Sequence, residues 1–251
     1  EESRARDGQP SRQRSQKRDR PRRRPGAPVT LKTRDGRMLA PGARWLLLTD
    51  ADILHAPDTA ARLVAKAEAE GLSLASLMAR LDARGPWGRL LIPAFVFFFQ
   101  KLYPFARVND PRDDTAAAAG GCVLLRRGAL EAAGGIASIR GALIDDCTLA
   151  ARIKHGPPRR AIWLGLAKGE AVSLRDNRPL PAIWSMVART AYTQLGRSPV
   201  LLAGTVLGMA LLYLAGPALA LSLPLHDAAL PAALGAGAWA LSAALYLPTL
   251  R

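Results

Sequence analysis

Residues 44–53 read RWLLLTDADI, an apolar segment of strand character that ends at two carboxylates, Asp50 and Asp52. Alternate residues of a β-strand point to the same side, so this spacing predicts that both carboxylates face one way. Acidic side chains just past the end of a buried strand lie where open α/β sheets bind ligands. Their oxygens suit Mg²⁺ or Mn²⁺ held together with substrate phosphates. The alternative is a pair of solvated loop acids or helix caps, the commoner origin of an Asp-x-Asp pair.

Strand-like and helix-like segments alternate from about residue 43 to residue 197. This alternation indicates an α/β layer architecture. The predicted strands cover residues 45–49, 72–77, 121–125 and 161–164. The predicted helices cover residues 58–70, 127–133, 146–154 and 180–195.

The N-terminal segment, residues 1–42, is basic and poor in apolar side chains. Residues 1–40 contain 13 Lys or Arg and 5 Asp or Glu, and so carry more than half of the formal net charge of +15. Such a segment buries too little apolar surface to offset its ordering entropy, so we expect it to be disordered. A basic tail attracts anionic lipid or nucleic acid, but without interleaved aromatic residues or a recognised binding fold we expect no specific nucleic-acid partner. A membrane-anchored nucleic-acid-binding protein is a hypothesis that rests on this tail alone.

Two uncharged segments, residues 199–225 and 228–250, close the chain. Each is longer than the roughly 20 residues that a helix needs to cross a bilayer, so they predict a transmembrane hairpin; a buried hairpin of a soluble protein is the alternative. Arg189 and Arg197 precede the first segment, Arg251 follows the second, and the connector has no Lys or Arg. The positive-inside rule then places the α/β domain in the cytoplasm.

Five glycines within these segments suit close helix packing in lipid: Gly204, Gly208, Gly216, Gly235 and Gly237. A further apolar stretch, residues 90–99, is too short to span a membrane. It fits either a core helix or an interfacial helix, and its three consecutive phenylalanines favour the interface, with Tyr103 and Arg107 near the headgroups. Cys122 and Cys147 are the only cysteines, and we expect both to be free, buried thiols.

Three further features carry candidate chemistry. Asp145 and Asp146 open a predicted helix, where acids cap the orphan amides, and a carboxylate held there can also act as a general base. Gly120 and Gly121 indicate either a plain turn or a close approach of the backbone to a ligand. Arg189 lies on an amphipathic helix and is either a juxtamembrane charge or a clamp for a diphosphate.

The order of these features resembles the membrane-bound family 2 glycosyltransferases of GT-A fold over roughly residues 43–250. Several segments look like the bacterial hopanoid-biosynthesis-associated glycosyltransferases: LTDADI (48–53), FFFQKLYPF (97–105), VNDP (108–111), AAGGC (118–122) and RTAYTQL (189–195). The resemblance implies a partial GT-A, Rossmann-like domain over residues 43–197, followed by a transmembrane hairpin over residues 198–251.

The same resemblance implies roles for individual residues. Asp50 and Asp52 match the family's D-x-D motif, which holds a divalent metal and the diphosphate of the nucleotide sugar. Asp146 matches the family's base, with Asp145 where Glu is usual. Gly120 and Gly121 fall on the acceptor side of the site. The implied cofactor is Mg²⁺ or Mn²⁺.

Two departures from the family pattern affect the expected activity. At the positions of the Q-x-x-R-W signature of processive relatives, Met186 and Thr190 replace Gln and Trp, whereas Arg189 is kept. This favours transfer of a single sugar over polymerisation. The resemblance also implies strands before the D-x-D motif that this chain lacks, so we expect a truncated N-terminal part.

The sequence therefore predicts an inverting glycosyltransferase in the inner membrane of a bacterium. It would move a sugar from a nucleotide donor, a UDP-sugar, to a lipid acceptor of hopanoid biosynthesis. The alternative is a catalytically incomplete membrane protein that only binds lipid or a partner.

Overall fold

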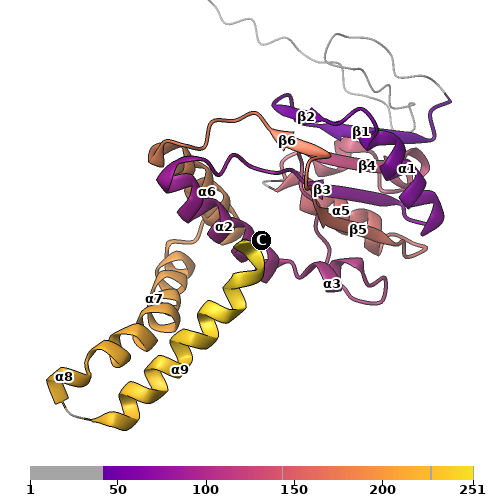
Figure 1. Ribbon diagram of the computed structural model, residues 1–251. Helices are drawn as coiled ribbons and strands as arrows, with labels where there is room; N and C mark the ends of the chain where they lie inside the picture. The colour runs from indigo at the N-terminus through magenta and orange to yellow at the C-terminus, as the bar shows by residue number, and fades with distance from the viewer. Residues whose placement is uncertain (1–41, 143, 227, 251) are drawn as a thin grey trace, which may run out of the picture. The chain divides into compact units, whose positions relative to one another are not determined.

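The computed structural model describes residues 42–142, 144–226 and 228–250. The predicted disordered segment, residues 1–42, lies outside the described residues except for Gly42. Within them, the predicted α/β character is confirmed: strands and helices alternate, and two long apolar helices follow (Figure 1).

The described strands form a four-stranded mixed sheet. Its order is β1 (Trp45–Thr49), β4 (Cys122–Arg126), β3 (Leu74–Met78) and β5 (Ile162–Leu166). All four lie within two residues of their predicted bounds. Strand β4 runs antiparallel to both β1 and β3, whereas β3 and β5 are parallel. The C-terminal ends of β1 and β3 therefore meet the N-terminal end of β4 at one edge of the sheet, where Thr49 pairs with Cys122.

A second, two-stranded sheet was not predicted. It pairs β2 (Ile53–His55) antiparallel with β6 (Ala171–Ser173). Because β2 begins directly after Asp52, the Asp-x-Asp segment is a turn, with the amide of Ile53 donating to the carbonyl of Asp50 at 3.3 Å. The Asp-x-Asp segment is therefore not the strand end that was expected, but both of its aspartates line one cavity.

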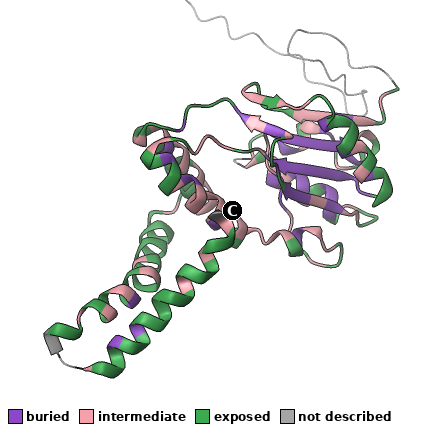
Figure 2. Cartoon of the chain, in the orientation of Figure 1, coloured by how far each residue is buried: buried purple, intermediate pink, exposed green. Residues whose placement is uncertain are grey.

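Helices pack on both faces of the larger sheet. Helix α1 (Thr59–Ala69) places Leu63 and Ala67 in the core with strand residues such as Ala75. Helix α5 (Asp145–His155) contacts β5, and α4 (Arg127–Ala132) and η1 (Ile136–Ile139) lie between β4 and α5 in the chain. Figure 2 shows the buried residues concentrated in the strands and the helices beside them. Cys122 and Cys147 are free and buried, as predicted.

The apolar stretch at residues 90–99 is the middle of a longer helix, α2 (Gly85–Leu102). This helix contacts α6 (Leu180–Gln194), and the hydroxyl of Tyr103 accepts a 2.7 Å hydrogen bond from the amide of Gln194. Rings of the phenylalanine run pack against the C-terminal helices rather than all facing outward. The interfacial position of this segment stays a prediction.

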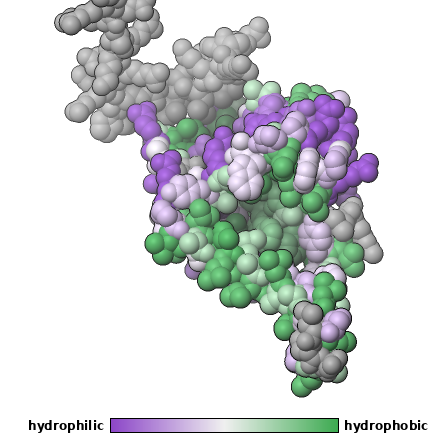
Figure 3. Space-filling view, turned by 90° about the vertical axis from the view of Figure 1, so that its left-hand side faces the viewer, coloured by the Kyte–Doolittle hydropathy of each residue, from purple (hydrophilic) through white to green (hydrophobic). Residues whose placement is uncertain are grey.

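The C-terminal segments form helices α7 (Pro199–Leu221), α8 (Leu223–His226), α9 (Ala229–Tyr246) and η2 (Leu247–Leu250). Two stretches, Pro199–Leu221 and Ala229–Thr249, are long and apolar enough to cross a membrane, with mean hydropathies of 1.9 and 1.5. Only 6% and 11% of the residues in their most apolar windows are buried, so the core helix of a soluble protein is a poor description of either. Figure 3 shows hydrophobic residues extending from this hairpin, at the bottom of the view, over the neighbouring surface.

Two of the five glycines in these helices mediate their packing. A Cβ at Gly235 would lie 2.7 Å from the carbonyl oxygen of Gly216, and one at Gly216 would lie 3.2 Å from that of Gly235. Gly204, Gly208 and Gly237 have no such neighbour within 4 Å, so the prediction that they pack helices is wrong within the described residues.

The loop before β4 is held by a buried lysine. Lys154 of α5 is fully buried and donates hydrogen bonds to the carbonyls of Arg107, Val108 and Thr115 at 3.3, 2.8 and 2.7 Å. These carbonyls lie in and after the short helix α3 (Phe105–Asn109). Burial lowers the pKa of the Lys154 ammonium, but its three N–H groups all have acceptors.

We predict that Gly235→Ala destabilises the hairpin and that Gly237→Ala does not. The new methyl group at 235 meets backbone of α7, and overpacking of this kind costs about 1–3 kcal/mol. Thermal unfolding of the detergent-solubilised variants measures the difference. Equal unfolding temperatures for the two variants would contradict the packing described here.

We also predict that Lys154→Met lowers the free energy of unfolding by about 2–4 kcal/mol, because the buried carbonyl of Val108 and the partly buried carbonyl of Thr115 lose their donor. Arg152→Met, on an exposed position of the same helix, is the matched control and should have little effect. Denaturant titration measures stability, and limited proteolysis at residues 107–115 reports the loop. A Lys154→Met protein as stable as the control would refute this role.

Candidate active site

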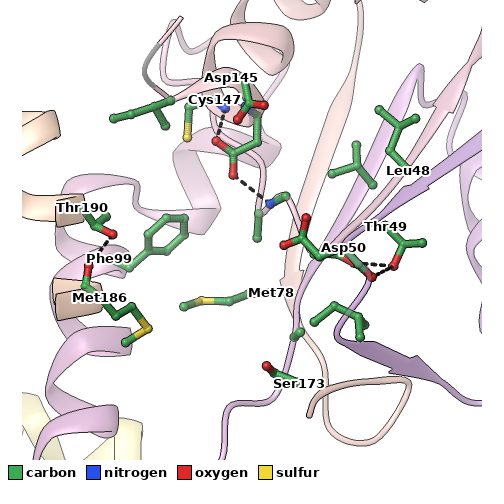
Figure 4. Close-up of a pocket in the computed structure, with 18 of the residues that line it drawn as sticks. Leu48, Thr49, Asp50, Met78, Phe99, Asp145, Cys147, Ser173, Met186 and Thr190 are labelled. Atoms are coloured by element: carbon green, nitrogen blue, oxygen red, sulfur yellow. Dashed lines mark hydrogen bonds between the residues drawn. The ribbon is translucent and has the colours of Figure 1, made fainter. Parts of the chain in front are cut away.

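One pocket of about 610 Å³ opens at the edge of the sheet where β1 and β3 end and β4 begins. Every site residue proposed from the sequence lines it: Asp50, Asp52, Gly120, Gly121, Asp145, Asp146 and Arg189. The walls come from the turn after β1, the loop before β4, the start of α5, the segment after β6, and helices α2 and α6 (Figure 4).

The glycine pair links the two acidic segments. The hydroxyl of Thr49 donates to the carbonyl of Gly121 at 3.0 Å, which fixes the end of β1 just before Asp50. The amide of Gly120 donates to the Asp146 carboxylate at 2.8 Å. The antiparallel pairing of β1 with β4 makes this possible, because it brings the beginning of β4 beside the end of β1. The D-x-D turn and the start of α5 are therefore connected through a single dipeptide.

The Asp146 carboxylate is positioned by backbone amides and is partly buried. One oxygen accepts from Gly120 and the other from the amide of Cys147 at 2.7 Å. Burial raises the pKa of Asp146 above its usual value, and the two amides oppose this rise only in part. The raised pKa makes Asp146 a stronger base than a solvated aspartate. The capping interpretation also holds, because Asp145 accepts from the amide of Asp146 at 3.1 Å within the same first turn.

Gly120 is needed for close approach and not for its backbone angles. Its φ is not in the left-handed region, but a Cβ there would lie 3.3 Å from the nearer oxygen of Asp146. The neighbouring Gly121 would place a Cβ 3.2 Å from Ile53. The pair also forms the turn into β4, so the two interpretations of this motif are compatible.

The Asp52 carboxylate is ion-paired with Arg175 at 3.2 Å, whereas Asp50 is exposed. No group of three or more metal-ligating side chains gathers anywhere in the described ranges. Two carboxylates suffice for Mg²⁺ when substrate phosphates supply further oxygens. The residues present therefore fit a metal that arrives with a diphosphate, and do not form a cage that would hold one alone.

The wall formed by α2 and α6 is more apolar. Phe99, Met186 and Thr190 face the acidic side across the pocket (Figure 4), and Arg189 adds a positive charge there. The three positions that correspond to the Q-x-x-R-W signature thus all line the pocket, including the two that depart from it. Cys147 also lines it, and burial raises the pKa of its thiol to about 12.

Three lining residues at the end of β6 and just after it were missed from the sequence: Ser173, Arg175 and Asn177. Asn177 is 1% exposed, and its amide has no hydrogen-bond partner among the described residues. Because β6 pairs with β2, this segment is carried next to the Asp-x-Asp turn, and the amide of Leu174 donates to the carbonyl of Asp52 at 2.7 Å. The only local signal was the charged run RDNR at residues 175–178.

Comparison with known proteins identifies the family. The sequence model of glycosyl transferase family 21 matches residues 39–251, most of the chain. The chain belongs to glycosyl transferase family 21. No curated protein matches it significantly.

The matched range contains the pocket and the two apolar helices. The match begins before β1 and runs through both apolar helices, so it includes every wall of the pocket and the hairpin. The expectation of a glycosyltransferase is thereby confirmed.

We predict that Gly120→Ala slows glycosyl transfer by about tenfold without unfolding this family 21 protein. The methyl group displaces the Asp146 carboxylate by a few tenths of an ångström, and small misplacements of reacting groups cost large factors in rate. Gly169→Ala, at a position with nothing within 4 Å, is the control. Initial rates and circular dichroism of both variants test this, and an unchanged rate in Gly120→Ala would be inconsistent with it.

Proposed function

We propose that the chain is a metal-dependent, inverting glycosyltransferase of GT-A type that transfers one sugar from a nucleotide donor to a hydroxyl of a membrane lipid. The observation that carries this proposal is the meeting, in one pocket, of the D-x-D turn after β1 with a partly buried carboxylate at the start of α5. The first suits a diphosphate and its metal, and the second suits a base.

Electrostatics supports binding of the donor with a cation. Four aspartates line the pocket against two described arginines, Arg175 and Arg189. A bare diphosphate would face like charges here, so it needs compensation. In this proposal Asp50 and Asp52 would hold Mg²⁺ or Mn²⁺, and the bound metal would supply positive charge beside the leaving diphosphate. Arg175, released from Asp52, and Arg189 can pair with phosphate oxygens.

Asp146 is the proposed base. It accepts the proton of the acceptor hydroxyl as that oxygen bonds to the anomeric carbon, and the bond to the diphosphate oxygen breaks on the opposite face. The bonding electrons leave with the nucleotide diphosphate, and the anomeric configuration inverts. Its raised pKa favours proton uptake, and the two backbone amides keep the carboxylate in place.

A lipid acceptor fits the apolar wall of the pocket and the adjoining hairpin. If α7 and α9 span the membrane, Arg189 and Arg197 beside them place the pocket at its cytoplasmic face. Resemblance adds a hopanoid as the proposed acceptor and a UDP-sugar as the proposed donor. The replacements at Met186 and Thr190 support a single transfer.

We predict that Asp146→Asn lowers transfer by at least about 10²-fold while UDP binding persists, because only proton removal is lost. Asp52→Asn should instead abolish Mn²⁺-dependent UDP binding. Asp58→Asn, outside the pocket, is the control for both. Isothermal titration with UDP, with and without Mn²⁺, measures binding, and transfer from UDP-sugars to a panel of hydroxylated lipids, hopanoid polyols included, measures turnover.

The pH profile provides an independent check. The base must be ionised to act, so kcat/KM should fall as the pH drops through the raised pKa of Asp146, above the usual range for aspartate. Wild-type rates in Asp146→Asn would eliminate it as the base. Metal-independent UDP binding would refute the role of the Asp-x-Asp turn, and absence of both binding and transfer would favour a protein that only binds lipid or a partner.

A further inference from the structure

A second cavity, of about 510 Å³, lies between α2 and the two long C-terminal helices. Its lining is almost wholly apolar and aromatic: Phe97, Phe98, Met209, Ala210, Tyr213, Leu214, Trp239, Ser242, Ala243 and Tyr246. Its volume lies in the range of cavities that bind small molecules. It contains no charged side chain, so it suits a hydrocarbon and not a polar ligand.

Aromatic pairs join α2 to both long C-terminal helices. Phe97 meets Tyr246 of α9 edge to face with ring centroids 5.3 Å apart, and Phe98 meets Tyr213 of α7 at 5.8 Å. Such T-shaped pairs are favoured contacts between rings. They join α2 to each of the long helices, so the cavity has three helical walls.

Helix α2 is also a wall of the active-site pocket. Phe95 and Phe99 line that pocket, whereas Phe97 and Phe98 line the apolar cavity. Successive residues of a helix rise by about 1.5 Å, so the two linings lie at the same level of α2 on different faces. An amphiphile with its hydroxyl at Asp146 has apolar surface within reach around this helix.

We propose that this cavity binds the hydrocarbon part of the acceptor lipid while its hydroxyl group enters the active-site pocket. This inference rests on the proposed function. Two observations favour the acceptor lipid as the occupant. The cavity shares α2 with the pocket where a hydroxyl must react, and its other walls are the two helices apolar enough to lie in a bilayer. Binding of any bilayer lipid irrespective of headgroup is the competing outcome.

The test fills the cavity without touching the active-site pocket. Ala210→Phe and Ala243→Phe place rings in it, and Ala215→Phe, on an exposed position of α7 outside the lining, is the matched control. The probes are a diazirine-bearing hexadecylglycerol and a diazirine-bearing hexadecane, which lacks the hydroxylated head. The full chain in nanodiscs is irradiated with each probe, and peptides of α2, α7 and α9 are quantified by mass spectrometry.

We expect the hexadecylglycerol probe to label the Phe97–Phe98 segment at least tenfold more than hexadecane does, and each cavity-filling variant to lose that labelling while Ala215→Phe keeps it. With alkylglycerols accepted as substrates, KM should fall as methylenes are added until the cavity is full. The filled variants should lose this dependence on chain length.

Equal labelling by both probes would overturn the inference, because the cavity would then take any bilayer chain. Labelling unchanged by Ala210→Phe and Ala243→Phe would overturn it as well. UDP titration in the same samples separates the two proposals: intact metal-dependent binding with unaffected labelling rejects only the lipid cavity, whereas lost binding in the wild type rejects the proposed function.

Discussion

The reversed direction of β4 is the constraint on which the active site depends. Because β4 runs antiparallel to β1 and β3, the glycine pair at its beginning lies at the sheet edge where those two strands end. One peptide of that pair is then close enough to donate to Asp146, while the next contacts Thr49 beside the D-x-D turn. If β4 ran parallel to β1, the glycine pair would lie at the opposite ends of the strands. No backbone amide would then connect the D-x-D turn with the start of α5.

The sequence was sufficient where local pattern determines structure and insufficient where distant segments pair. WLLLT at residues 45–49 is apolar and strand-forming, and its strand was predicted to the residue. The Asp-x-Asp turn was misread because β2 exists only through its pairing with β6, more than a hundred residues later. The same pairing brings Arg175 and Asn177 to the pocket, and the charged run at residues 175–178 does not by itself indicate this position. Likewise, Gly235 and Gly237 look equivalent in the chain, and only the neighbouring helix distinguishes them.

Burial of the Asp146 carboxylate links the site to the stability of the fold. A carboxyl group whose pKa is raised in the folded state stabilises that state below its unfolded pKa, and this contribution is lost as pH rises through the folded pKa. Above the raised pKa of Asp146 the protein therefore carries an ionised group that opposes folding. Enzymes commonly tolerate such a cost at sites that need a tuned base. Interactions elsewhere in the domain must offset this cost. The hydrogen bonds by which Lys154 fixes the loop before β4 are among them.

The thiol of Cys147 lies next to this base, and its burial has a consequence for redox chemistry. Its sulfur lies 3.5 Å from the carbonyl of Ala118, and its pKa of about 12 leaves almost no thiolate at neutral pH. Peroxides and electrophiles attack the thiolate, so we expect Cys147 to react slowly with them. Its oxidation would otherwise disturb the neighbouring Asp146. The environment that strengthens the carboxylate as a base thus also shields its neighbour from oxidative inactivation.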